Sequence, residues 1–186
     1  MMEIERRNYA MREFRIADDN DEFKIIGHAA VFDSLSEDLG GFREKIAKGA
    51  FRESIAVADV RALFNHDPNF VMGRNRSGTL RLTEDDVGLK IEINPPDTQF
   101  SRDIQVSVAR GDINQMSFGF YTKADKWEKE ESGKWVRTLL GVELFDISVV
   151  TYPAYPSTDV AVRSLANVKK QQFSGLKFAK MRLDLI

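Results

Sequence analysis

Two long alternating segments joined by a short polar turn place the strongest limit on what this chain can fold into. The segments are INQMSFGFYTKADKWE (113–128) and KWVRTLLGVELFDISVVTY (134–152), and KEESG lies between them. Apolar and polar residues that alternate over this length predict two β-strands, and the short polar connection predicts a hairpin with an exposed tip. The prolines of PAYPST (153–158) end the second strand, because proline cannot donate to a central ladder.

Earlier segments predict further strands and two helices. Residues 23–32 are rich in β-branched and aromatic types, and residues 77–96 alternate as a second hairpin would. Apolar residues at near-helical spacing predict a helix over 44–59, although Gly49 is unfavourable inside it. A second helix is expected over 97–112.

The ends of that second helix have recognisable signals. Asp97 can cap its first turn, and Gly111 can end it. The chain as a whole is therefore expected to be α+β and mostly β.

Composition limits the domain organisation and the chemistry. A chain of 186 residues suggests one domain, here residues 1–162, followed by a basic tail over 163–186 that holds six Lys or Arg and one acidic residue. The tail is either a solvated C-terminal extension or a separate segment with a role of its own. The sequence has no cysteine, which excludes disulfides and thiolate chemistry, and its two histidines exclude a three-histidine zinc site.

Several partners and compartments are disfavoured. The net charge of -2 gives no global attraction to nucleic acid. No apolar run is long enough to span a membrane, and the charged N-terminus does not look like a signal peptide. We therefore expect a cytoplasmic protein with no cofactor, no metal, no membrane and no nucleic acid.

Ser117 is the first candidate for chemistry. Alternation places Met116, Phe118 and Phe120 on one face of their strand, and Ser117 on the other beside Gly119. A glycine within a strand often marks the close approach of a ligand or another backbone. The pattern alone is equally compatible with a solvent-facing serine, and that interpretation is the simpler one.

Asp146 is the second candidate, because an acid within an apolar strand is costly unless it is paired or exposed. Alternation groups it with Ser148, and groups Phe145 with Ile147 and Val149. If the two long strands pair, Asp146 and Ser117 can share a face. Glu143 would project from the opposite face, and a surface salt bridge is the alternative role for Asp146.

His66 is the third candidate. A serine hydroxyl needs a base to become a nucleophile, and a neutral imidazole held by a carboxylate is such a base. The other imidazole, His28, groups with Ile26 and Ala30 in a predicted strand, so we expect a core or sheet-surface role for it. Taken alone, His66 could equally be a loop residue that is hydrogen-bonded close to Asp67.

Four motifs together resemble a known family. IIGHAAVFD with FREKIAKGAFRESI, then ALFNHDPNFVMGR, INQMSFGF and ELFDISVVTYPAYP resemble, in this order, segments of the tailed-phage prohead proteases. These are capsid-maturation serine proteases related in fold to herpesvirus assemblins. The resemblance covers about residues 20–163.

The resemblance implies a fold and a set of roles. The fold would be a small, mostly antiparallel β-barrel wrapped by a few helices. His66 would be the general base and Ser117 the nucleophile. Assemblins use a second histidine as the third member, and this chain has none there, so Asp146 is expected to take that role, with Glu143 as the alternative.

The implied function is that of a serine endopeptidase. It would cleave the scaffolding part of the major capsid protein, and itself, inside an assembling procapsid in the host bacterial cytoplasm, and it could form a homo-oligomer. The alternative is a non-enzymatic capsid scaffold or assembly protein that keeps the same barrel.

Overall fold

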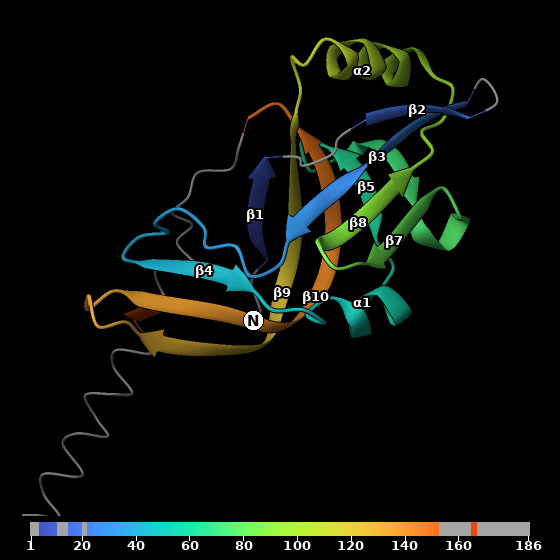
Figure 1. Ribbon diagram of the computed structural model, residues 1–186. Coiled ribbons are helices and arrows are strands. Elements are labelled where there is room, and N and C mark those ends of the chain that lie inside the picture. The colour runs from blue at the N-terminus through green and yellow to red at the C-terminus, as the bar shows by residue number, and fades with distance from the viewer. Residues whose placement is uncertain (1–3, 11–14, 20–21, 153–164, 167–186) are drawn as a thin grey trace, which may run out of the picture.

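The structure is a computed structural model, and it describes residues 4–10, 15–19, 22–152 and 165–166. Its described residues form an α+β fold in which strands predominate and helices are few, as expected (Figure 1). None of the described helices is long and apolar enough to cross a membrane.

The larger of two sheets contains both long strands. Its order is β1-β9-β10-β5-β6, and β4 also pairs with β10. The strands are β1 (Glu5–Ala10), β4 (Phe42–Ile46), β5 (Arg61–Phe64), β6 (Asp67–Arg74), β9 (Gln115–Lys129) and β10 (Trp135–Val150).

The smaller sheet has the order β2-β3-β8-β7. Its strands are β2 (Arg15–Asp19), β3 (Glu22–Val31), β7 (Leu80–Glu84) and β8 (Gly88–Ile93). Three short or amphipathic helical elements complete the described fold: α1 (Arg52–Val57), the 3-10 turn η1 (Asn75–Ser77) and α2 (Gln99–Ala109).

Strand β10 organises the larger sheet. It pairs antiparallel with β9 along its whole length, which confirms the predicted hairpin. Its other edge is shared, because the first part pairs parallel with β4 and the last part pairs parallel with β5. Figure 1 shows β9 and β10 running through the molecule together. The end of β10 therefore lies between the strand that carries Ser117 and the strand that leads to His66.

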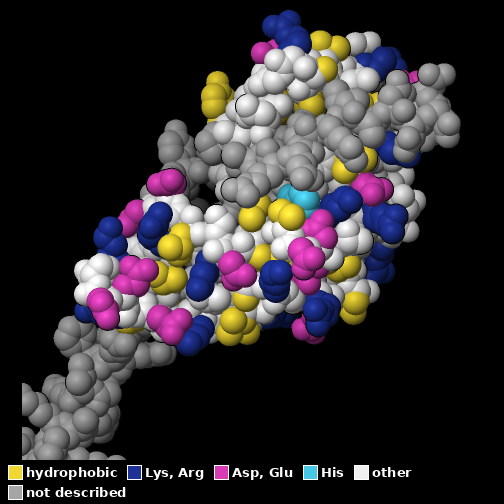
Figure 2. Space-filling model, viewed as in Figure 1, with side chains coloured by type: hydrophobic (Ala, Val, Ile, Leu, Met, Phe, Trp, Pro, Cys, Tyr) yellow, Lys and Arg dark blue, Asp and Glu magenta, His cyan; other side chains and the backbone are white. Residues whose placement is uncertain are grey.

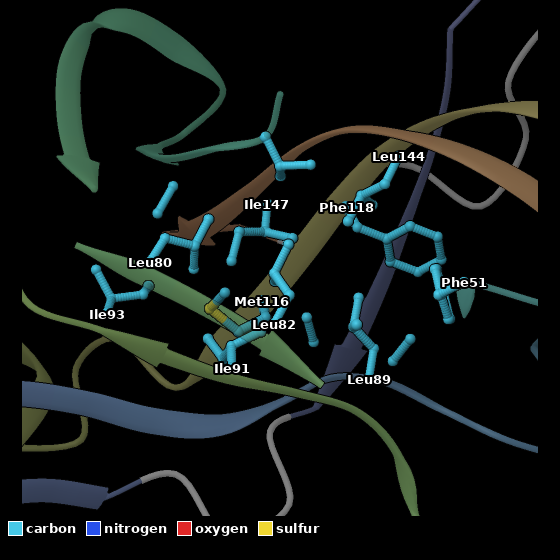
Figure 3. Close-up of a cluster of buried hydrophobic side chains, with 14 of the residues drawn as sticks. Phe51, Leu80, Leu82, Leu89, Ile91, Ile93, Met116, Phe118, Leu144 and Ile147 are labelled. Atoms are coloured by element: carbon cyan, nitrogen blue, oxygen red, sulfur yellow. The ribbon is translucent and has the colours of Figure 1, made fainter. Parts of the chain in front are cut away.

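The main core fills the space between the two sheets. Met116 and Phe118 of β9 and Ile147 of β10 are fully buried, as the alternation of β9 predicts. They belong to one cluster with Leu82 and Ile91 of the smaller sheet, and Figure 3 shows these side chains gathered together. Because one face of β9 is committed to this core, the opposite face is the one that can carry polar chemistry.

The predicted helix over 44–59 is wrong in its first half. Residues 42–46 form β4 with alternating burial, and only α1 is helical. Gly49, with φ +89°, breaks the segment between them in a left-handed conformation that interrupts a helix. Pairing of β4 with β10 satisfies backbone groups that the isolated pattern assigned to a helix.

The second predicted helix is confirmed with a change at its start. It runs over α2, and Gly111 follows it with φ +80°, as expected for a helix-ending glycine. The cap is Thr98 rather than Asp97, because the Thr98 side chain accepts a hydrogen bond from the Ser101 amide.

No closed barrel is found among the described strands, since both sheets have open orders, so the barrel stays a prediction. The boundary between residues 162 and 163 lies outside the described residues. So does the basic tail, apart from residues 165–166.

Candidate active site

His66 lies in a tight turn between two strands. Phe64 and Asp67 pair at the ends of β5 and β6, and only Asn65 and His66 connect them. Both have left-handed backbones, with φ of 51° and 58°. A two-residue hairpin turn with positive φ at both positions is of type I′, which suits the twist of paired strands. A left-handed conformation costs a non-glycine residue about 1–3 kcal/mol, so the surroundings must hold it.

The end of β10 holds this turn. The Asn65 amide donates to the Val149 carbonyl at 2.9 Å, and the Asn65 side-chain oxygen accepts from the Thr151 amide at 2.9 Å. The His66 amide donates to the Ser148 hydroxyl at 3.1 Å. These contacts fix the turn against β10 from both of its residues.

The imidazole of His66 joins the other two candidates. Its Nε2 lies 2.7 Å from the Ser117 hydroxyl, and its Nδ1 is hydrogen-bonded to the Asp146 carboxylate. Ser117 is fully buried, Asp146 is 2% exposed, and the His66 side chain is 11% exposed. The structure therefore brings together all three residues that the sequence singles out, from three different strands or turns.

The pairing of β9 and β10 explains how Asp146 reaches the site. Ser148 lies opposite Ser117, and Asp146 lies opposite Gly119. A Cβ atom added to Gly119 would be 3.0 Å from Oδ2 of Asp146. Gly119 thus leaves room for a carboxylate, which is the close approach that a glycine within a strand predicts.

Glu143 does not reach the site, although the reason differs from the one predicted. The register shifts between Leu144 and Asp146, so that Glu143 lies opposite Tyr121 on the same face as Ser117. Tyr121 is four residues further along β9, about 13 Å at the usual rise per residue. The Glu143 carboxylate binds Lys123 at 2.6 Å in an exposed ion pair.

The same irregularity overturns the predicted placement of Phe145. We grouped it with Ile147 and Val149, which are fully buried, but Phe145 is 48% exposed. It is the extra residue of the bulge, because Leu144 and Asp146 oppose consecutive residues of β9. A bulged residue leaves the alternation that an uninterrupted strand follows.

His28 is 3% exposed within its sheet, in agreement with a core role. Its Nε2 lies 2.9 Å from the Asp85 carboxylate. Burial would raise the pKa of Asp85, but the Gly88 amide and His28 hold it below its ordinary value. Among the described contacts of His28 there is no serine hydroxyl, so His66 alone has the arrangement that a nucleophile requires.

Ser148 was not singled out as a site residue, yet it is fully buried in the middle of this cluster. Its hydroxyl lies 3.3 Å from Oδ1 of Asp146 and 3.2 Å from Nδ1 of His66. The signal was present in the sequence, because alternation places Ser148 on the face of Asp146. A serine in a strand is too common for that signal to mark a site.

A second buried polar cluster lies in the larger sheet. Arg7 of β1 binds Glu44 of β4 through two nitrogen–oxygen contacts of 2.7 and 3.0 Å. Arg137 of β10 lies 2.7 Å from Glu5 and 3.1 Å from Glu44. Burial alone would raise the pKa of Glu5, but the hydrogen bond and charge of Arg137, together with Arg7, hold it below its ordinary value. These four residues, the ion cluster, connect β1, β4 and β10 beside β9.

The chemistry available at the site is that of a serine activated by an imidazole. A hydroxyl, an imidazole and a carboxylate in series can transfer a proton from the hydroxyl and stabilise the imidazolium that results. No group of three or more potential metal ligands occurs among the residues that the structure describes.

Comparison with known families identifies the chain. The family model for the caudovirus prohead serine protease matches residues 10–171. The chain belongs to this family. Separate searches of curated proteins and of solved structures return no match. As a prohead serine protease, the chain is a serine peptidase of viral capsid maturation, which favours the enzyme over a non-enzymatic scaffold.

Proposed function

We propose that the prohead protease cleaves peptide bonds through an acyl-enzyme formed on Ser117. The Ser117 Oγ attacks the scissile carbonyl carbon while Nε2 of His66 takes the hydroxyl proton. The imidazolium then gives this proton to the leaving amine nitrogen as the carbon–nitrogen bond breaks. A water molecule, deprotonated by the same imidazole, releases the acyl group and restores the serine.

The contacts of His66 support these roles. With the proton on Nδ1 donated to Asp146, Nε2 is left as the acceptor that faces the Ser117 hydroxyl at 2.7 Å. The buried carboxylate of Asp146 stabilises the imidazolium once it forms. This single chain of contacts is the observation that carries the proposal.

The substrates are proposed from the family. We infer that the enzyme cuts the scaffolding part of the major capsid protein, and itself, inside the assembling procapsid in the host cytoplasm. A homo-oligomer is compatible with that setting. On the face in Figure 2, side chains of both charges are interspersed, so the visible surface offers no single-sign patch for nucleic acid.

Processing of a co-expressed capsid protein tests the proposal. Ser117→Ala removes the nucleophile, and the capsid protein should stay at full length on a denaturing gel. Loss of activity should come without loss of fold, because the hydroxyl contributes one hydrogen bond to a buried site.

The matched control is Ser132→Ala. Ser132 is exposed at the tip of the β9–β10 hairpin, so this variant should process the capsid protein normally. Processing at the wild-type rate by Ser117→Ala would exclude Ser117 as the nucleophile.

A further inference from the structure

Ser148 is placed to act on two members of the site at once. It lies on β10 between β9 and β5, opposite Ser117 on one side and opposite Leu63 on the other. Its side chain is fully buried. Within the part of the chain that the structure describes, its hydroxyl is hydrogen-bonded to His66 and Asp146 alone, so neither solvent nor a substrate is needed to explain these contacts.

The donors and acceptors around Ser148 match one hydroxyl group. Its oxygen accepts the backbone N–H of His66 at 3.1 Å, and its one hydrogen can be donated to Oδ1 of Asp146 at 3.3 Å. The second lone pair faces Nδ1 of His66 at 3.2 Å, where it can share the N–H that Asp146 accepts. The hydrogen and both lone pairs therefore have partners within the site.

Each of these contacts stabilises a feature of the site that is unfavourable by itself. His66 has a left-handed backbone, and the Ser148 hydroxyl receives its amide. Asp146 is a buried carboxylate, and no ion pair with Arg or Lys is found for it among the described residues. Arg6 lies opposite Gly119, and Arg61 lies opposite Asp146 itself, where it binds Asp59 instead.

We infer that Ser148 is a positioning residue of this protease, which aligns His66 on Ser117 and holds the Asp146 carboxylate in place. The inference rests on the proposed roles of those three residues. Ser148 does not touch the reacting atoms. It fixes the backbone of the base and one oxygen of the carboxylate that orients that base.

Proheads assembled with each variant provide the test, with the rate of capsid-protein processing measured across the range in which imidazoles titrate, about pH 5 to 9. Ser148→Ala should slow processing about 10- to 100-fold, because a small misalignment of the base is enough for such a loss. The acid limb of its pH–rate profile should also move, because that limb reports protonation of the base His66, and the variant changes the contacts of both Nδ1 of His66 and the Asp146 carboxylate.

Two variants separate alignment from packing. Ser148→Thr keeps the hydroxyl and should restore both the rate and the acid limb, whereas Ser148→Cys replaces it with a slightly larger thiol, a weak donor and acceptor, and should resemble Ser148→Ala. Ser101→Ala removes another buried hydroxyl, far along the chain on α2, and should leave the profile unchanged. If Ser148→Ala does not fold, the Thr and Cys variants carry the test alone, and equal profiles for those two would overturn the inference.

The outcomes also separate this inference from the proposed function. Wild-type rate in Ser148→Ala, or a slower rate with an unmoved acid limb, overturns the positioning role while Ser117→Ala stays inactive. Activity in Ser117→Ala would overturn the nucleophile assignment, on which the inference depends.

Discussion

Two buried polar clusters of the larger sheet, which share only β10, have opposite electrostatic designs. The ion cluster contains two guanidinium groups and two carboxylates, so its charges compensate one another at neutral pH. The proposed catalytic cluster of His66, Ser117 and Asp146 combines one carboxylate with an imidazole and a hydroxyl. Within the part of the chain that the structure describes, no Arg or Lys forms an ion pair with Asp146.

Their positions follow from strand alternation. Arg7 and Glu5 lie opposite Phe118 and Phe120, on the core face of β9, whereas Ser117 projects from the other face. Burial of a charge is unfavourable unless a partner compensates it. In the ion cluster the compensating partners are guanidinium groups, which stay charged throughout. In the proposed mechanism, the cation that compensates Asp146 forms only when His66 takes the serine proton, and this would favour the charged intermediate of the reaction over the resting state.

Removal of the charge of Asp146 gives the largest expected effect. Asp146→Asn should lower the rate of capsid-protein processing about 10⁴-fold, because the amide favours the wrong tautomer of His66. The free energy of unfolding should be unchanged or higher, since a buried, uncompensated charge has been removed. Prohead processing and urea denaturation measure the two quantities separately.

Glu143→Gln is the matched control for that substitution. Its carboxylate lies on the same face but binds Lys123 in solvent, so processing should be unaffected. The reverse result, with Glu143→Gln the more damaging change, would reassign the third member of the site.

The ion cluster should respond in the opposite way. Arg137→Met leaves Glu5 and Glu44 buried with Arg7 as their remaining guanidinium partner in the cluster. Loss of one partner from a buried ion pair typically destabilises a protein by about 3–5 kcal/mol. Urea denaturation should show this loss, and any fall in processing should follow the fraction of folded protein.

Arg110→Met provides the comparison for Arg137→Met. Arg110 forms an exposed ion pair with Asp112, and such pairs contribute about 0–1 kcal/mol. Equal stability losses in the two variants would show that the ion cluster does not hold β1 and β4 against β10.

The local patterns predicted the strands that carry the site and the face of Ser117. None of these patterns brought the three residues together. That step needed the parallel pairing of β5 with the end of β10, a contact between residues more than 80 positions apart.

The wrong predictions have a common physical cause. The structure of a segment depends on the strands with which it pairs, and a pattern within the segment contains no information about them. Alternation assigned Glu143 to the wrong face because the bulge at Phe145 shifts the register by one residue. The helix predicted over 44–59 lost its first half to pairing with β10. The ion cluster was not anticipated, since its members come from three strands that are distant in the sequence.

A methyl group at Gly119 should disturb the catalytic cluster by a smaller amount. In Gly119→Ala the new Cβ would be 3.0 Å from Oδ2 of Asp146 and 3.4 Å from Ile4, so the carboxylate must shift by a few tenths of an ångström. We expect processing to slow about tenfold, because catalysis is sensitive to such displacements. Gly141→Ala is the control, since its Cβ would meet Ala124 at an ordinary 3.8 Å. Equal rates in the two variants would contradict the close approach of Asp146.

The exposed ion pair between Lys123 and Glu143 gives the smallest expected effect, although it lies on the same face as the site. Both side chains are 48% exposed, so water and salt screen their attraction. Lys123→Ala should change the free energy of unfolding by less than about 1 kcal/mol. Because the Glu143 carboxylate left behind can hydrate, it lacks the desolvation that makes Glu5 and Glu44 sensitive to loss of Arg137. Urea denaturation at low and high salt measures the difference. A loss as large as that of Arg137→Met would show that burial does not separate the two kinds of ion pair in this protein.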